Sequence, residues 1–229
     1  MRTWVPLWAA CGVMCFTQVL LGGSAVVTIY PKQEIGAVNH LLFGGNQLAY
    51  QDSQDEYGNR GAGIWDPEKR RSVPEYVALA KLSGLSVSRW PGGCGAHAYN
   101  WKRTVGAVVD RQTQAFGLPE FLRWCGDTDS LPLITLPVYW GTPDDAADLV
   151  EYLNAPNDGS NPNGGRDWAA LRAADGHAPP YDVVWFEFGN ETYHGMHAGQ
   201  LPRQRIVAEE YVERYRTTRT AMKAIDPRI

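Results

Sequence analysis

The chain has 229 residues, of which 44% are apolar and 20% are charged, and its formal net charge is −4. This composition is typical of a globular protein with a buried core, and the lack of a basic run argues against nucleic acid as a partner. Because the sequence also lacks a Cys-x-x-Cys pair and a Cys/His cluster with zinc-ligand spacing, we expect neither a metal nor a cofactor.

The first 25 residues differ in composition from the rest. Arg2 is the only charged residue before Lys32, and an apolar run over residues 4–21 is followed by small residues. This pattern predicts a signal peptide over residues 1–25 with cleavage near Ala25, and therefore a secreted or periplasmic protein. Since the run has about 18 residues, an uncleaved membrane anchor is the alternative. We expect no other membrane association.

Apolar runs alternate with helical periodicities along the remainder of the chain. The predicted strands lie within residues 40–45, 85–93, 131–141 and 182–191. The predicted helices cover residues 74–84, 117–126, 142–154 and 208–226. A Gly/Asn/Pro-rich segment at about residues 155–180 has loop composition. Strands that are apolar on both faces and alternate with helices indicate a parallel sheet in an α/β fold.

Two α/β architectures compete, a doubly wound sheet and a (β/α)8 TIM barrel. The first strand is followed by neither GxGxxG nor GxxxxGK[ST], so nucleotide binding has no support. Polar and glycine-rich residues gather after the carboxyl ends of the strands, where barrel enzymes build their sites. A barrel needs eight βα units and about 250 residues. The sequence therefore predicts about four units, a truncated half barrel.

The segment WFEFGNETYHG, residues 185–195, ends an apolar strand in an Asn-Glu pair. Glu191 lies at the carboxyl end of this strand, and Glu187 lies roughly 13 Å earlier at about 3.3 Å per residue. Strand alternation places Glu187, Gly189 and Glu191 on one face and Asn190 on the other, unless the strand end twists. Glu187 is expected to point into the barrel, where it needs a cationic or hydrogen-bonding partner. Taken alone, Glu191 also fits an ordinary surface carboxylate.

Six segments together resemble the α-L-arabinofuranosidases of glycoside hydrolase family 51, which are retaining (β/α)8-barrel glycosidases. They are LLFGGN, SRWPGGCGAHAYNWKRTVG, FGLPEFLRWC, GTPDDAADLVEYLN, FEFGNETYHG and AMKAIDPRI. The resemblance covers about residues 35–229, in order and with compatible spacing. It implies that residues 35–229 form the amino-terminal half of the catalytic barrel. Residues 26–34 would contribute a strand to an accessory β-sandwich.

The resemblance implies roles for residues at the carboxyl ends of the strands. Glu191 would be the general acid/base, and Asn190 would hydrogen-bond the 2-hydroxyl group of the sugar. Arg89 would orient the nucleophile, whereas the residues alone also allow a buried ion pair between Arg89 and Glu187. The remaining candidates for substrate binding are Asn46, Tyr139, Tyr193 and His194.

Some positions depart from the family pattern. Cys94 stands where members commonly have Asn, and an ungapped match puts Leu48 where many have Glu, which suggests a divergent branch and a different glycoside. His194 lies close to His197, but no third metal ligand is evident, so we expect no metal site there. In this family the second carboxylate comes from the seventh strand, for which the sequence offers no candidate.

The sequence thus predicts an exported enzyme that releases non-reducing-end α-L-arabinofuranosyl residues with retention. Its partner would be an arabinose-containing oligosaccharide or polysaccharide. The alternatives are a β-xylosidase or glucuronidase-like exo-glycosidase of the same clan, or a non-catalytic carbohydrate-binding barrel. Since a retaining enzyme needs two carboxylates, we expect residues 1–229 alone to be inactive.

Overall fold

The computed structural model describes residues 26–47, 61–111, 116–139, 141–193 and 205–229. The chain divides into two compact units, Met1–Ala37 and Val38–Ile229. In the first unit, residues 26–37 are exposed and contain no strand, and one turn is closed by the N–H of Gln33, which donates to the carbonyl oxygen of Tyr30 at 2.9 Å. The assignment of residues 26–34 to a β-sandwich stays a prediction.

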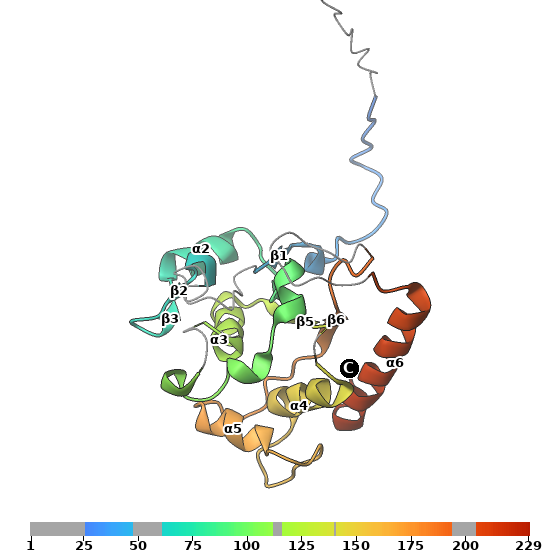
Figure 1. Ribbon diagram of the computed structural model, residues 1–229. Coiled ribbons are helices and arrows are strands. Elements are labelled where there is room, and N and C mark those ends of the chain that lie inside the picture. Colours follow the sequence, from blue (N-terminus) through green and yellow to red (C-terminus); the bar gives the residue numbers. More distant parts are fainter. Residues whose placement is uncertain (1–25, 48–60, 112–115, 140, 194–204) are drawn as a thin grey trace, which may run out of the picture. The chain divides into compact units, whose positions relative to one another are not determined.

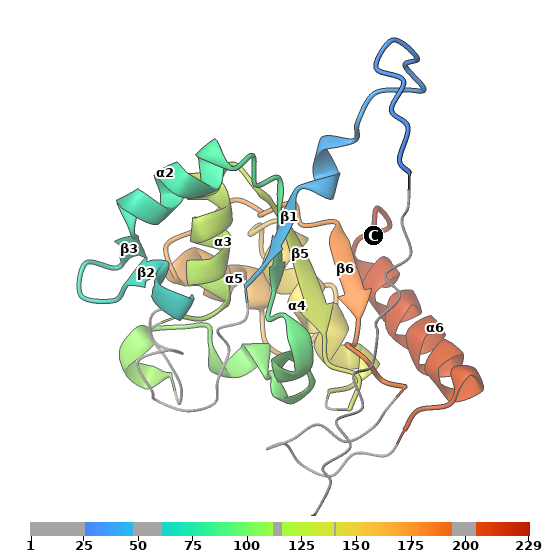
Figure 2. The ribbon, with the colours of Figure 1, turned by 90° about the horizontal axis from the view of Figure 1, so that it is seen from above.

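The second unit is built on a four-stranded parallel sheet with the order β1-β4-β5-β6 (Figures 1 and 2). The strands are β1 (Gly44–Asn46), β4 (Val87–Trp90), β5 (Leu131–Leu136) and β6 (Trp185–Phe188). Their order follows the chain, as a barrel requires, and all four carboxyl ends lie at one edge. A separate antiparallel pair is formed by β2 (Trp65–Asp66) and β3 (Arg71–Ser72).

The predicted helices are confirmed as α2 (Pro74–Leu82), α3 (Leu118–Thr128), α4 (Pro143–Asn154) and α6 (Ala208–Ile225). Short 3-10 helices cover His40–Leu42, Gly61–Gly63, Gly93–Ala98, Trp101–Arg103 and Val108–Asp110. Helix α4 packs against both α5 and α6 (Figure 1). None of the helices within the described ranges is long and apolar enough to cross a membrane.

Two sequence predictions about local structure were wrong. The apolar run at residues 40–45 is a strand only from Gly44 onward, because the Asn39 side chain accepts a hydrogen bond from the N–H of Leu41 at 3.0 Å and starts a 3-10 turn. The segment expected to be a loop contains α5 (Trp168–Ala174). Its first turn is capped by Asp167, whose side chain accepts from the N–H of Ala170 at 2.7 Å.

The sheet has one apolar and one polar face at its carboxyl end. Trp90 is fully buried in the core and stacks on Phe121 of α3, with ring centroids 5.1 Å apart. Ile134 and Leu136 of β5 belong to the same core. Because side chains alternate along a strand, the intervening residues point to the opposite face, which lines the barrel interior. The polar side chains of that face form the site.

Candidate active site

Arg89 lies at the carboxyl end of β4 and joins residues from three strands. Its Nη1 donates to Oδ1 of Asn46 on β1 at 3.2 Å, and its Nε forms an ion pair with Glu187 on β6. Its Nη2 donates to Oδ1 of Asn190, just after β6, at 3.0 Å. The register places Asn46 directly opposite Arg89, so the first contact follows from strand pairing.

Glu187 has the partners that the sequence led us to expect. Thr135 on β5 donates its hydroxyl to Oε1 of Glu187 at 2.5 Å, and Arg89 binds the same oxygen. The Arg89 and Glu187 side chains are only 22% and 32% exposed, so the pair is largely shielded from water. The ion-pair interpretation of Arg89 is therefore confirmed. A role for Arg89 in orienting a nucleophile stays a prediction.

The chain leaves strand geometry directly after β6. The N–H of Gly189 still donates to the carbonyl oxygen of Leu136 at 2.9 Å, but Gly189 has φ 78° and Glu191 has φ 44°. Two left-handed residues break the strand alternation. The Asn190 side chain consequently reaches Arg89 on the same face as Glu187. Strand alternation predicted Asn190 on the opposite face unless the strand end twists, and the departure from strand geometry at Gly189 is that exception.

Glu191 is exposed at this edge and adjoins Cys94. The thiol of Cys94 donates to Oε2 of Glu191 at 3.9 Å and accepts from Nδ2 of Asn190 at 3.8 Å. Cys94 and Cys125 are both free cysteines. The residue that departs from the family pattern thus contacts both members of the Asn-Glu pair.

His97 and Tyr139 contact the backbone on either side of Glu191. Nε2 of His97, a buried side chain, hydrogen-bonds the carbonyl oxygen of Asn190. The Tyr139 hydroxyl donates to the carbonyl oxygen of Thr192 at 3.4 Å, and its ring lies edge-on to His97 with centroids 4.8 Å apart. The sequence offered no signal for His97, since its partner is distant along the chain.

Of the two remaining residues predicted to bind substrate, Tyr193 and His194, the structure describes only Tyr193. Tyr193 is 63% exposed beside Glu191. His194 and His197 lie outside the described residues. Within the described ranges, no group of three His, Cys, Asp or Glu side chains is arranged to hold a metal ion.

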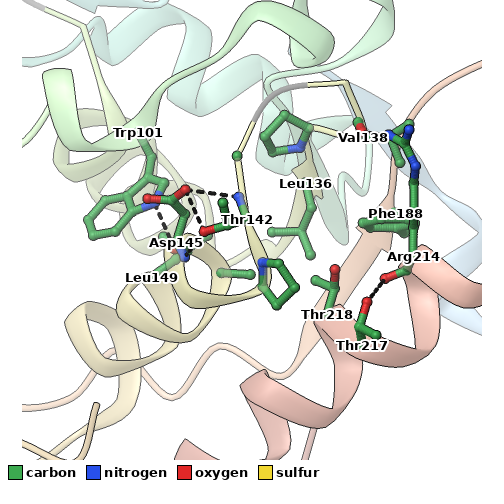
Figure 3. Close-up of a pocket in the computed structure, with 14 residues that line it drawn as sticks. Trp101, Leu136, Val138, Thr142, Asp145, Leu149, Phe188, Arg214, Thr217 and Thr218 are labelled. Carbon is green, nitrogen blue, oxygen red and sulfur yellow. Dashed lines mark hydrogen bonds between the residues drawn. The ribbon is translucent and has the colours of Figure 1, made fainter. Parts of the chain in front are cut away.

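A cavity of about 250 Å³ lies on the other face of the sheet, between the start of α4 and α6 (Figure 3). It is lined mainly by apolar groups, among them Leu136 and Phe188, which alternate along their strands with Thr135 and Glu187. It does not include Glu191. The candidate active site is therefore the polar cluster around Arg89 and Glu191, and this cavity is part of the helix-facing side.

Comparison with known proteins identifies the family of the chain. Residues 78–229 match the family model described as the alpha-L-arabinofuranosidase 1 domain. The chain belongs to this family. It is 29% identical to alpha-L-arabinofuranosidase C of Emericella nidulans, over 93% of this chain and 42% of that protein. It is 30% identical to intracellular exo-alpha-(1->5)-L-arabinofuranosidase 1 of Bacillus subtilis, over 73% of this chain and 34% of that protein.

A solved structure shares the fold. The family 51 α-L-arabinofuranosidase from Thermotoga petrophila superposes with a TM-score of 0.62 at 26% identity, over 82% of this chain and 39% of that one. The resemblance and the partial-barrel fold predicted from the sequence are thus confirmed. The chain spans less than half the length of each of these relatives.

Proposed function

We propose that the protein containing this chain is an exported, retaining α-L-arabinofuranosidase acting on arabinose-containing oligosaccharides or polysaccharides. The observation that carries the proposal is the convergence of Arg89, Glu187 and Asn190 beside Glu191. They meet at the carboxyl edge of a parallel sheet, where barrel enzymes bind and transform their substrates. Family membership supports the same chemistry.

In this proposal Glu191 is the general acid/base. Its protonated carboxyl gives its proton to the glycosidic oxygen as the bond to the anomeric carbon breaks, and a second carboxylate forms an ester with the sugar. The Glu191 carboxylate then takes a proton from water, which attacks the anomeric carbon and releases the second carboxylate. Its exposed position leaves room for both the leaving group and the incoming water.

The second carboxylate must lie about 5–5.5 Å from Glu191 in a retaining enzyme. Glu187 is a poor candidate because its Oε1 is already bound by Arg89 and Thr135. We propose that the nucleophile comes from the seventh strand of the full-length barrel. Arg89 would then help to orient it while neutralising Glu187.

Asn190 is placed to contact the sugar in a fixed orientation. Because its Oδ1 accepts from Arg89, its Nδ2 is the side that faces Cys94, which in turn contacts Glu191. A hydroxyl group of the sugar close to the scissile bond would bind there. The thiol of Cys94 is a weaker hydrogen-bonding partner than an amide, so the neighbouring sugar contact would be weaker than in relatives with Asn at this position.

Export is proposed from residues 1–25 alone. Their apolar run and small flanking residues have the signal-peptide pattern. The Bacillus subtilis relative is named as intracellular, so family membership does not decide the location. Amino-terminal sequencing of the protein recovered from the producing cells tests the proposal. A mature chain beginning near residue 26 supports export, and an intact Met1 in the cytoplasm contradicts it.

The catalytic proposal is tested with Glu191→Gln in the full-length protein. We expect kcat/KM to fall by about 10²–10⁴-fold on an arabino-oligosaccharide, whose leaving group needs a proton. The loss should be much smaller on 4-nitrophenyl α-L-arabinofuranoside, whose leaving group is already a weak base. Equal losses on both substrates would contradict the acid role.

A panel of aryl β-xylosides and β-glucuronides, assayed with the unmodified protein, tests the sugar specificity. Turnover confined to the arabinofuranoside supports the proposal. Preferred turnover of a xyloside or glucuronide favours the other exo-glycosidases of the clan. Binding without turnover of any of them favours a non-catalytic barrel.

A further inference from the structure

A buried histidine forms a hydrogen bond with the backbone next to Glu191. His97 is 1% exposed, and its Nε2 hydrogen-bonds the carbonyl oxygen of Asn190. Since a carbonyl oxygen can only accept, Nε2 of His97 must carry the proton. This bond acts on the peptide group that joins Asn190 to Glu191.

The conformation of this peptide group sets the position of the Glu191 side chain. Glu191 has φ 44°, a left-handed conformation that non-glycine residues seldom adopt. Such a conformation persists only where the surroundings hold it. The Asn190 side chain is fixed by Arg89, and its carbonyl group is fixed by His97. Together the two contacts determine the direction in which the Cα–Cβ bond of Glu191 leaves the backbone.

Tyr139 completes the arrangement on the other side of Glu191. Its hydroxyl reaches the carbonyl oxygen of Thr192, and its ring packs edge-on against His97. The carbonyl groups before and after Glu191 are therefore contacted by two aromatic side chains that also touch each other. The hydroxyl contact is long, at 3.4 Å, so His97 provides the stronger of the two restraints.

We propose that His97 is a positioning residue that aims the Glu191 carboxyl at the leaving-group oxygen, with Tyr139 as its supporting partner. This inference rests on the proposed function of Glu191. It gives Tyr139 a different task from the substrate-binding role predicted from the sequence. A misplacement of about 1 Å in a proton donor can cost about 10²-fold in rate. Loss of the His97 hydrogen bond would therefore slow proton transfer from Glu191.

The test uses His97→Met and His97→Gln in the full-length protein. Methionine fills a similar volume without an N–H donor, whereas the glutamine amide can place a donor near the position of Nε2. We expect His97→Met to lose about 10–100-fold in kcat on an arabino-oligosaccharide and less than about 3-fold on 4-nitrophenyl α-L-arabinofuranoside. His97→Gln should restore most of the oligosaccharide activity.

His177→Met is the matched control. His177 lines a groove with Leu131 and Pro132, at the amino end of β5, and is therefore at the opposite edge of the sheet from Glu191. Its replacement should leave the ratio of the two activities unchanged. Tyr139→Phe should lower kcat on the oligosaccharide by a few-fold, with little change in KM on either substrate.

The outcomes separate the two proposals. If Glu191→Gln shows the leaving-group dependence and His97→Met loses both activities equally, or loses neither, the positioning role is overturned while the acid role stands. If Glu191→Gln shows no such dependence, both proposals are overturned. A rise of KM on both substrates in Tyr139→Phe, without a fall in kcat, overturns the supporting role of Tyr139. Should His97→Met fail to fold, His97→Asn replaces it, because its shorter amide cannot reach the Nε2 position.

Discussion

Replacing Arg172 by methionine should lower the free energy of unfolding by about 3 kcal/mol. Arg172 lies on α5 and is fully buried. Its guanidinium group donates to the carbonyl oxygens of Tyr152 at 2.8 Å, Ala155 at 2.8 Å, Ala178 at 3.0 Å and His177 at 3.2 Å. It therefore caps the carboxyl end of α4, where the last carbonyl groups have no partner within the helix.

The magnitude follows from what methionine leaves behind. The two buried acceptors, the carbonyl oxygens of Tyr152 and Ala155, cost about 1–3 kcal/mol each when they lose their partner, or about 4 kcal/mol together. Part of this is offset because the cation no longer has to be buried. Burial opposes the charged form, which is why the pKa of Arg172 lies below its ordinary value. Methionine also keeps much of the apolar stem in the core, so about 3 kcal/mol remains.

Urea unfolding of the full-length protein, followed by tryptophan fluorescence, measures the effect. Trp168 begins α5 and packs on Trp101, with ring centroids 4.8 Å apart, so the signal reports on this region. The control is Arg216→Met, at an exposed position on α6, which should change stability by less than about 0.5 kcal/mol. Equal midpoints for the two variants would refute the argument that Arg172 holds the α4–α5 junction.

Three further predictions concern stability. Gly126→Ala should stabilise α3 by about 0.5–1 kcal/mol, because nothing lies within 4 Å of the added Cβ and alanine is the better helix former. Gly117→Ala should destabilise, because its Cβ would lie 2.6 Å from the backbone oxygen of Thr104; both are measured as shifts of the urea midpoint. Asp145→Asn should cost about 1 kcal/mol at pH 7, since it removes a partner of Lys102. Burial raises the Asp145 pKa, but hydrogen bonds and the charge of Lys102 outweigh it and hold the pKa below 3.8. The wild type is therefore more stable than Asp145→Asn above pH 3.8 and loses this extra stability as the pH falls further. The free energies of unfolding of the two proteins should converge below pH 3.8.

Elements whose signals are local could be predicted from the sequence. Helix α4 starts as expected because its first turn forms two reciprocal hydrogen bonds. The N–H of Asp145 donates to the Thr142 hydroxyl at 3.1 Å, and the N–H of Thr142 donates to the Asp145 carboxylate at 2.9 Å. All of these groups lie within one turn. The proline at the start of α2, Pro74, is also a local signal, because it lies in the first turn of the helix that it starts.

Elements that depend on distant groups could not be predicted. The N–H of Trp168, at the start of α5, donates to the buried carboxylate of Glu151 on α4 at 2.9 Å. The composition around α5 has too many glycines and asparagines to reveal that contact. His97 was missed for the same reason, since its partner Asn190 is far away in the sequence. The face that Asn190 occupies could not be predicted from strand periodicity, because the left-handed conformation of Gly189 turns the chain just before Asn190.

The position of Arg89 follows from the packing of its neighbour. Trp90 is fully buried between Phe121 and Tyr99, with ring centroids 5.1 Å and 4.7 Å away. A slip of β4 by one residue would turn Trp90 toward the polar face and push the Arg89 guanidinium into the core. Burying an unpaired cation would cost several kcal/mol, in addition to the lost burial of the indole. The aromatic core therefore fixes the register of β4, and that register delivers Arg89 to the face where Glu187 and Asn190 meet it.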